Sequence, residues 1–175
     1  TRAALATLRP PRDFTICDWA DEHRRLSAES SAEPGRWRTA RAEYQRGIME
    51  AISDAATETV VVMSSAQVGK TEILNNSTGY FIDQDPCPIM LVMPTEREAE
   101  AWSKDRFTPM ARDTPALQGK ISDPRSRDGD NKILHKKFPG GHLTVAGANA
   151  PAGLASRPIR ILLCDEVDRY PQSAG

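Results

Sequence analysis

The segment at residues 60–71 has the residue types needed to bind the phosphates of a nucleoside triphosphate. It reads Val-Val-Val-Met-Ser-Ser-Ala-Gln-Val-Gly-Lys-Thr, so a short apolar run leads into a loop that ends in Gly-Lys-Thr. Backbone N–H groups at the start of the following helix would face the phosphates, and the helix dipole would favour their negative charge. Lys70 would reach the β- and γ-phosphates, and the Thr71 hydroxyl would bind Mg²⁺. The predicted phosphate-binding residues are Ser65, Ala66, Gln67, Val68, Gly69, Lys70 and Thr71.

One position in this segment departs from the P-loop pattern G-x-x-x-x-G-K-[ST]. The pattern has glycine where this chain has Ser64. A Gly-Lys-Thr tripeptide also arises by chance, so a helix that simply begins with an exposed lysine is the alternative.

Two neighbouring acids downstream supply the other half of a nucleotide site. Residues 160–166 form an apolar run that ends in Asp165 and Glu166, and its lack of alternation is typical of a strand buried on both faces of a parallel sheet. Carboxylates at such a position are costly unless a cation meets them. Asp165 is predicted to hold Mg²⁺ and Glu166 to act as the catalytic base that deprotonates the attacking water, with Lys70 as the second catalytic residue. The alternative is a strand that ends in a polar surface turn.

The elements that must position these residues alternate along the chain. The expected strands are residues 59–63, 89–93 and the acidic run, and the expected helices are residues 14–26, 39–54, 71–82 and a segment that begins with the capping box of Thr95 and Glu98. Residues 132–138 and 142–146 flank Pro139-Gly140-Gly141 and predict a β-hairpin. We therefore expect an α/β fold of the P-loop NTPase kind, with a mostly parallel sheet flanked by helices.

The composition limits the class of protein. A length of 175 residues suits one domain, and a net charge of −1 creates no global field that would attract nucleic acid. The three cysteines lack C-x-x-C spacing, so neither a disulfide framework nor a zinc site is expected. No apolar run reaches the roughly 18 residues of a membrane-spanning helix, and no secretory signal is visible. A cytoplasmic protein without a membrane partner is expected.

The chain is expected to divide into two parts. Residues 1–35 are polar and irregular and predict an N-terminal arm with a short helix, whereas residues 36–175 predict the P-loop domain. The sequence ends at Gly175, soon after the acidic run, although a P-loop sheet ordinarily continues further. The domain is therefore expected to be incomplete.

Four segments resemble the ATPase domain of the large terminase subunit of tailed bacteriophages, in its lambda-like GpA branch. They are the region around Tyr44-Gln45 at residues 37–49, the loop at 65–72, the Leu-Val-Met-Pro-Thr run at 91–95, and the loop and acidic strand at 147–171. The resemblance implies a RecA- or helicase-like core that hydrolyses ATP with Mg²⁺ and drives double-stranded viral DNA into a procapsid. It also implies a ring of subunits on the portal protein, a small terminase subunit as partner, and action in the bacterial cytoplasm and transiently on the procapsid. The family's nuclease is a separate C-terminal domain, which this sequence does not represent.

The resemblance further implies that Tyr44 and Gln45 bind adenine. A glutamine amide can pair with the adenine edge as donor and acceptor, and an aromatic ring can stack on a base. The same two residues on a helix are also common as packing and solvent contacts. Asn149 could likewise approach the phosphates or belong to an ordinary connection.

Such a motor needs a transition-state arginine and a surface that contacts DNA, and the sequence offers several candidate residues for each. Some terminases carry an arginine inside the P-loop, where this chain has Ala66, so a transition-state arginine would come from a neighbouring subunit or from Arg97, Arg106 or Arg157. The basic residues around the expected hairpin could track DNA phosphates or form a solvated loop; they are Arg125, Arg127, Lys132, Lys136 and Lys137.

Two rival functions share most of these features. A superfamily-two helicase has the same Gln motif, Gly-Lys-Thr loop and Asp-Glu strand, but commonly continues with Ala-His where this chain has Val167-Asp168. The other rival is a non-hydrolysing nucleotide-binding remnant of a prophage.

Overall fold

A computed structural model describes residues 14–65, 67–121, 132–154 and 158–172. Its main sheet has the strand order β4-β5-β3-β6. Strand β3 (Ile89–Met93) pairs in parallel with β5 (Gly141–Gly147) on one side and with β6 (Ile161–Cys164) on the other. Strand β4 (His135–Phe138) pairs antiparallel with β5 and forms the expected hairpin. The mixed α/β fold and these four strands are confirmed. The expectation that the acidic strand is buried on both faces is wrong, because β6 buries Leu163 on one face and leaves Leu162 60% exposed on the other.

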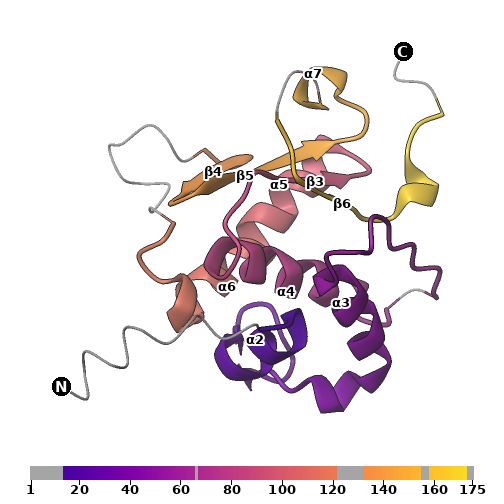
Figure 1. The fold of residues 1–175 in the computed structure, drawn as a ribbon. Helices are drawn as coiled ribbons and strands as arrows, with labels where there is room; N and C mark the ends of the chain where they lie inside the picture. Colours follow the sequence, from indigo (N-terminus) through magenta and orange to yellow (C-terminus); the bar gives the residue numbers. More distant parts are fainter. Residues whose placement is uncertain (1–13, 66, 122–131, 155–157, 173–175) are drawn as a thin grey trace.

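Most of the helices lie on one side of this sheet, and the short α7 (Pro151–Leu154) lies at the other (Figure 1). The helices are α2 (Ile16–His23), α3 (Arg46–Ser53), α4 (Lys70–Asp83), α5 (Glu96–Trp102), α6 (Thr108–Asp113) and α7, with shorter helical segments η1 (Thr39–Gln45), η2 (Ser103–Phe107), η3 (Pro115–Leu117) and η4 (Val167–Arg169), and a two-stranded ribbon of β1 (Arg25–Leu26) and β2 (Gly35–Arg36). Within the described ranges, no helix is long and apolar enough to cross a membrane.

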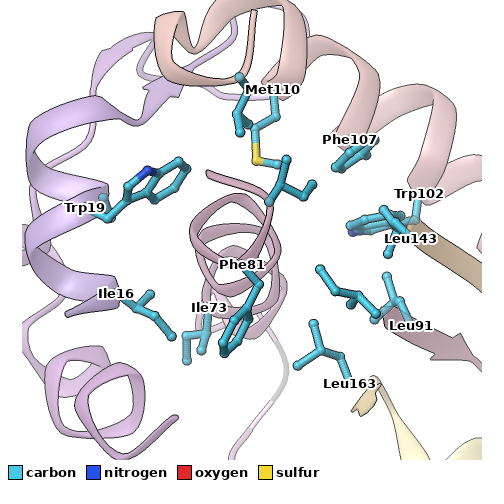
Figure 2. Close-up of a cluster of buried hydrophobic side chains, with 14 of the residues drawn as sticks. Ile16, Trp19, Ile73, Phe81, Leu91, Trp102, Phe107, Met110, Leu143 and Leu163 are labelled. Carbon is cyan, nitrogen blue, oxygen red and sulfur yellow. The ribbon is translucent and has the colours of Figure 1, made fainter. Parts of the chain in front are cut away.

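Helix α4 is the centre of the molecule, with α2 and α3 on the side away from the sheet (Figure 1). Figure 2 shows its apolar side chains between those of α2, such as Trp19, and those of the sheet, such as Leu91 and Leu163. The approach of α2 depends on Gly79, because a Cβ there would come within 2.2 Å of the Trp19 ring. Trp19 is fully buried, so the helix of the predicted arm is part of the same core.

Helix α5 begins as the sequence predicts. The Thr95 side chain accepts a hydrogen bond from the Glu98 backbone N–H, and the Glu98 carboxylate accepts from the Thr95 backbone N–H. This reciprocal capping satisfies two of the donors that a helix start leaves without a partner. It fixes the chain immediately after β3, where the site described below is built.

The strand predicted at residues 59–63 is wrong. Residues 57–65 have no regular secondary structure, and Val61 and Met63 are 85% and 98% exposed. A strand needs a neighbour that satisfies its backbone groups, and the sheet's pairings in the described chain involve only β3, β4, β5 and β6. The β-branched composition of this run favours a strand, but no ladder forms to stabilise one.

Candidate functional site

The loop before α4 is held from the side by η1. Gln45 Nε2 donates hydrogen bonds to the carbonyl oxygens of Val68 and Gly69, at 3.3 and 3.2 Å, and the Tyr44 hydroxyl donates to the Val68 carbonyl at 2.7 Å. Gly69 is the N-cap of α4 and has a left-handed backbone with φ of 75°. A Cβ at Gly69 would also lie within 2.7 Å of Gln45 Nε2. The left-handed backbone therefore favours glycine here, and a larger residue would also displace Gln45 Nε2 from the loop.

Gln45 itself carries an unsatisfied acceptor. The side chain is 2% exposed, and its Oε1 has no hydrogen-bond partner in the described chain. A buried acceptor left in this way costs about 1–3 kcal/mol, so a donor from a bound molecule would relieve it. The structure places Tyr44 and Gln45 against the loop backbone, and their contact with adenine stays a prediction.

The start of α4 and the end of β6 meet at Thr71 and Asp165. Thr71 Oγ1 donates to Asp165 Oδ2 at 3.4 Å, and the Asp165 backbone N–H donates to the Val92 carbonyl at 3.0 Å, which extends the pairing of β6 with β3. Asp165 is only 7% exposed. Burial, and then the neighbouring Glu166 carboxylate, raise the pKa of Asp165, although the Glu166 backbone N–H, Lys70 and Thr71 oppose the change. A buried carboxylate beside a hydroxyl is an arrangement that a divalent cation would stabilise.

Glu166 is exposed and has an unusual backbone. Its φ and ψ are both 49°, in the left-handed region that few residues other than glycine adopt. Arg169, three residues later on η4, donates to Glu166 Oε2 and also pairs with Glu98 Oε1 at 2.8 Å. Glu166 and then Glu98 raise the pKa of Arg169 through these hydrogen bonds. The predicted catalytic base therefore lies in an ion-pair cluster with Arg169 and Glu98.

A cleft of about 700 Å³ opens beside these residues. Thr71, Asp165 and Glu166 line it together with the segment at residues 28–32, and Arg106 lies at the same cleft and donates to the Ser30 carbonyl at 2.7 Å. The cleft thus brings together residues from α4, the end of β6 and η2. Each predicted catalytic or metal-binding residue lines it except Lys70, whose charge acts on Asp165.

Several other sequence predictions have different outcomes. Asn149 Oδ1 accepts from the Glu96 backbone N–H at 3.1 Å, so it contacts the start of α5 in an ordinary connection. Arg97 is exposed on α5, and Lys136 is 2% exposed within β4. Ala66, Arg125, Arg127 and Arg157 lie outside the described residues.

Sequence reasoning missed the role of Arg169. The capping box identified Glu98, and the spacing of Glu166 and Arg169 was visible in the sequence. Nothing in the sequence indicated that the start of α5 lies beside η4, so the contact that joins Glu98 to Arg169 was not predictable from spacing.

These residues fit a Mg-nucleotide. In the described ranges, no group of three or more histidine, cysteine, aspartate or glutamate side chains could hold a metal ion alone. Mg²⁺ in nucleotide sites ordinarily takes one or two protein ligands and completes its shell with phosphate oxygens and water. Thr71 and Asp165 supply such a pair, α4 offers its N-terminal amides, and Gln45 Oε1 lacks a donor.

Comparisons with known proteins identify the family of this chain. Residues 31–175 match the family model described as the phage terminase large subunit gpA, ATPase domain. The chain is 33% identical over 170 residues to the terminase large subunit of Escherichia phage lambda, which covers 97% of this chain and 26% of that protein. It is 30% identical over 167 residues to the terminase large subunit of Enterobacteria phage P21, which covers 95% of this chain and 26% of that protein. The chain therefore spans about a quarter of the length of these curated relatives. No solved structure matches it.

Proposed function

Because the chain belongs to the gpA ATPase-domain family of phage terminase large subunits, we propose that it binds ATP with Mg²⁺ and hydrolyses it in a DNA-packaging motor. The observation that carries this proposal is the meeting of Thr71 and Asp165, at the start of α4 and the end of β6. A hydroxyl and a buried carboxylate from two distant segments come together beside a helix N-terminus, as Mg-nucleotide chemistry requires.

Each predicted residue has a separate role in this proposal. Lys70 places its charge on the β- and γ-phosphates, and the backbone N–H groups of residues 65–71 surround them. Thr71 and Asp165 hold Mg²⁺, which neutralises developing charge on the phosphates when it is bound. Glu166 orients the attacking water and accepts its proton. Tyr44 and Gln45 hold the loop and contact the adenine.

The larger assignments follow from the family. We propose that residues 36–175 belong to a P-loop NTPase domain with a RecA- or helicase-like core and that residues 1–35 are its N-terminal arm. In the working motor, ATP hydrolysis would move double-stranded viral DNA into the procapsid, with a ring of subunits on the portal protein and a small terminase subunit as partner. The motor would act in the cytoplasm of the bacterial host and transiently on the procapsid.

Three substitutions test the proposed site. In Lys70→Ala, hydrolysis should be lost and nucleotide binding strongly weakened, because the one side-chain charge aimed at the phosphates is removed. In Glu166→Gln of the full-length motor, Mg-ATP should still bind while turnover nearly stops, because an amide does not accept the water's proton. In Asp165→Asn, the dependence on Mg²⁺ should change instead.

Binding of a fluorescent ATP analogue, titrated with Mg²⁺, and steady-state release of phosphate measure these effects. Unchanged ATP affinity in Lys70→Ala would remove Lys70 from the site. Loss of binding in both acid variants would contradict the division of roles between Asp165 and Glu166. Tight ATP binding with no turnover in the unsubstituted chain would favour the non-hydrolysing alternative.

A further inference from the structure

Arg169 joins the predicted catalytic base to an acid on another element. Its Nη1 donates to Glu166 Oε2 and its Nη2 pairs with Glu98 Oε1 at 2.8 Å. A planar guanidinium can serve two carboxylates at once because its N–H groups point in fixed directions. Both pairs line the cleft that also contains Thr71 and Asp165.

Glu98 is a rigid anchor for Arg169. Its Oε2 accepts from the Thr95 backbone N–H at 3.1 Å and from the Thr95 hydroxyl at 3.0 Å, which leaves Oε1 for Arg169. The first turn of α5 is held in addition by Asn149, which accepts from the Glu96 backbone N–H. The Glu98 carboxylate is therefore restrained when Arg169 moves, because it is hydrogen-bonded to Thr95 at the start of α5.

Glu166 lacks any comparable support. Its backbone is left-handed, its side chain is 40% exposed, and its carboxylate accepts the hydrogen bond from Arg169. The guanidinium occupies one acceptor site of Glu166 Oε2 and leaves the others, so its effect on the carboxylate is mainly one of orientation. The pair therefore fixes the direction in which the predicted base points.

We propose that Arg169, anchored by Glu98, is a positioning residue that restrains Glu166 in a resting state and must release it before hydrolysis. The inference rests on the proposed function and adds to it a regulatory contact at the same site. Exposed ion pairs of this kind are weak, so release requires only a small bias from nucleotide or from a partner.

The direct test is basal ATP turnover by Arg169→Gln. We expect kcat to rise about two- to fivefold with unchanged KM, because the contribution of an exposed pair corresponds to a factor of that order. Arg169→Lys keeps the charge but cannot serve two carboxylates equally well, so its kcat should lie between those of the unsubstituted chain and Arg169→Gln.

The matched control is Arg160→Gln. Arg160 pairs with Asp85 outside the cleft, and its side chain is 56% exposed, compared with 53% for Arg169. Its kcat should be unchanged.

Glu98→Gln tests whether the anchor acts through Arg169. Glutamine can still complete the capping box, so α5 should begin normally. Added to Arg169→Gln, it should cause no further change in kcat. An independent contribution of Glu98→Gln in this background would contradict the role of anchor.

A second measurement does not depend on turnover. Side-chain ¹⁵N NMR should show slow rotation of the Arg169 guanidinium, assigned by its loss in Arg169→Lys, and faster rotation in Glu166→Gln and in Glu98→Gln. Fast rotation in the unsubstituted chain, or a kcat that falls or stays constant in Arg169→Gln, would overturn the restraint while leaving the proposed function intact. Absence of ATP turnover in every variant would instead overturn the proposed function and the restraint with it.

Discussion

Two short apolar segments of this chain look alike in sequence but differ in strand pairing and in burial. Residues 59–63 read Thr-Val-Val-Val-Met and precede the predicted phosphate loop, and β6 reads Ile-Leu-Leu-Cys and precedes the two acids. Strand β6 pairs in parallel with β3 and buries Leu163, which is 7% exposed. The first segment pairs with no strand in the described chain and leaves Met63 98% exposed. The difference teaches that an apolar, β-branched run becomes a strand only where a neighbour satisfies its backbone.

The two halves of the site are therefore supported in different ways. Asp165 is positioned by the β6–β3 ladder, which its own N–H extends to Val92. The predicted phosphate loop is positioned by the side chains of Tyr44 and Gln45, which donate to its carbonyl oxygens. A ladder distributes its support over many backbone groups, whereas the loop depends on two side chains.

The largest effect expected from this comparison is in hydrogen exchange. Amide hydrogens of β6 that pair with β3 should exchange on the order of a thousandfold or more slowly than those of residues 60–63, because exchange from the sheet needs cooperative opening. Mass spectrometry of peptides from the two segments measures the ratio. Similar protection in both would mean that residues 60–63 pair with a strand in solution.

The second largest effect is expected in stability, because truncation of one side chain in each segment should lower the free energy of unfolding by different amounts. Leu163→Ala should lower the free energy of unfolding by about 2–5 kcal/mol, because it leaves a cavity between the sheet and α4. Met63→Ala should change it by about 0.5 kcal/mol or less, because its side chain is already in solvent. Urea denaturation followed by circular dichroism measures both, and equal losses would contradict the exposure of Met63.

The loop's dependence on Gln45 gives a smaller effect. Gln45→Ala removes two hydrogen bonds to the loop and should cost about 1–2 kcal/mol of stability. Exchange should accelerate in the loop before α4 and stay unchanged in β6. The matched control is Gln118→Ala, because Gln118 also donates to a backbone carbonyl, that of Arg112 at 2.8 Å, but lies on the surface. Acceleration in both segments would mean that Gln45 supports the fold as a whole.

The smallest effect concerns Asp83 at the C-terminal end of α4. The N-terminal end of this helix follows the loop and contacts Asp165 through Thr71. Asp83 accepts hydrogen bonds from Trp19 Nε1 at 2.8 Å and Gln84 Nε2 at 2.6 Å, and also pairs with Lys120. Although burial raises the pKa of Asp83, the hydrogen bonds from Lys120, Gln84 and Trp19 outweigh it and hold the pKa below its usual value. A lowered carboxyl pKa stabilises the fold above the unfolded value of about 3.9, and this stability is lost as pH falls through the folded value.

Asp83→Asn should therefore cost about 1 kcal/mol at pH 7, and the difference from the unsubstituted chain should shrink as the pH falls below about 4. Thermal unfolding of both proteins at pH 3 and at pH 7 measures this difference. Because Asp83 is remote from both segments, the ratio of their exchange rates should stay constant. A changed ratio would mean that α4 supports one half of the site more than the other.

The sequence alone determined the local features of this protein. The capping box of Thr95 and Glu98, the hairpin around Pro139-Gly140-Gly141, and strands β3 and β6 all follow from patterns within a few residues, so they were predictable. The Gly-Lys-Thr loop and the Asp-Glu pair were recognisable as halves of one site for the same reason. Their order along the chain, with the family resemblance, was enough to predict the ATPase-domain family that the comparisons confirm.

Only the tertiary structure decided which segments meet. It brought Thr71 to Asp165 across 94 positions of sequence, placed Gln45 on the loop backbone, and left residues 59–63 without a partner. It also set Arg169 between Glu166 and Glu98, a contact that depends on where α5 begins relative to η4. Patterns in a sequence report the preferences of neighbouring residues. Pairing between distant segments depends instead on which surfaces are buried together, and that is a property of the whole packed chain.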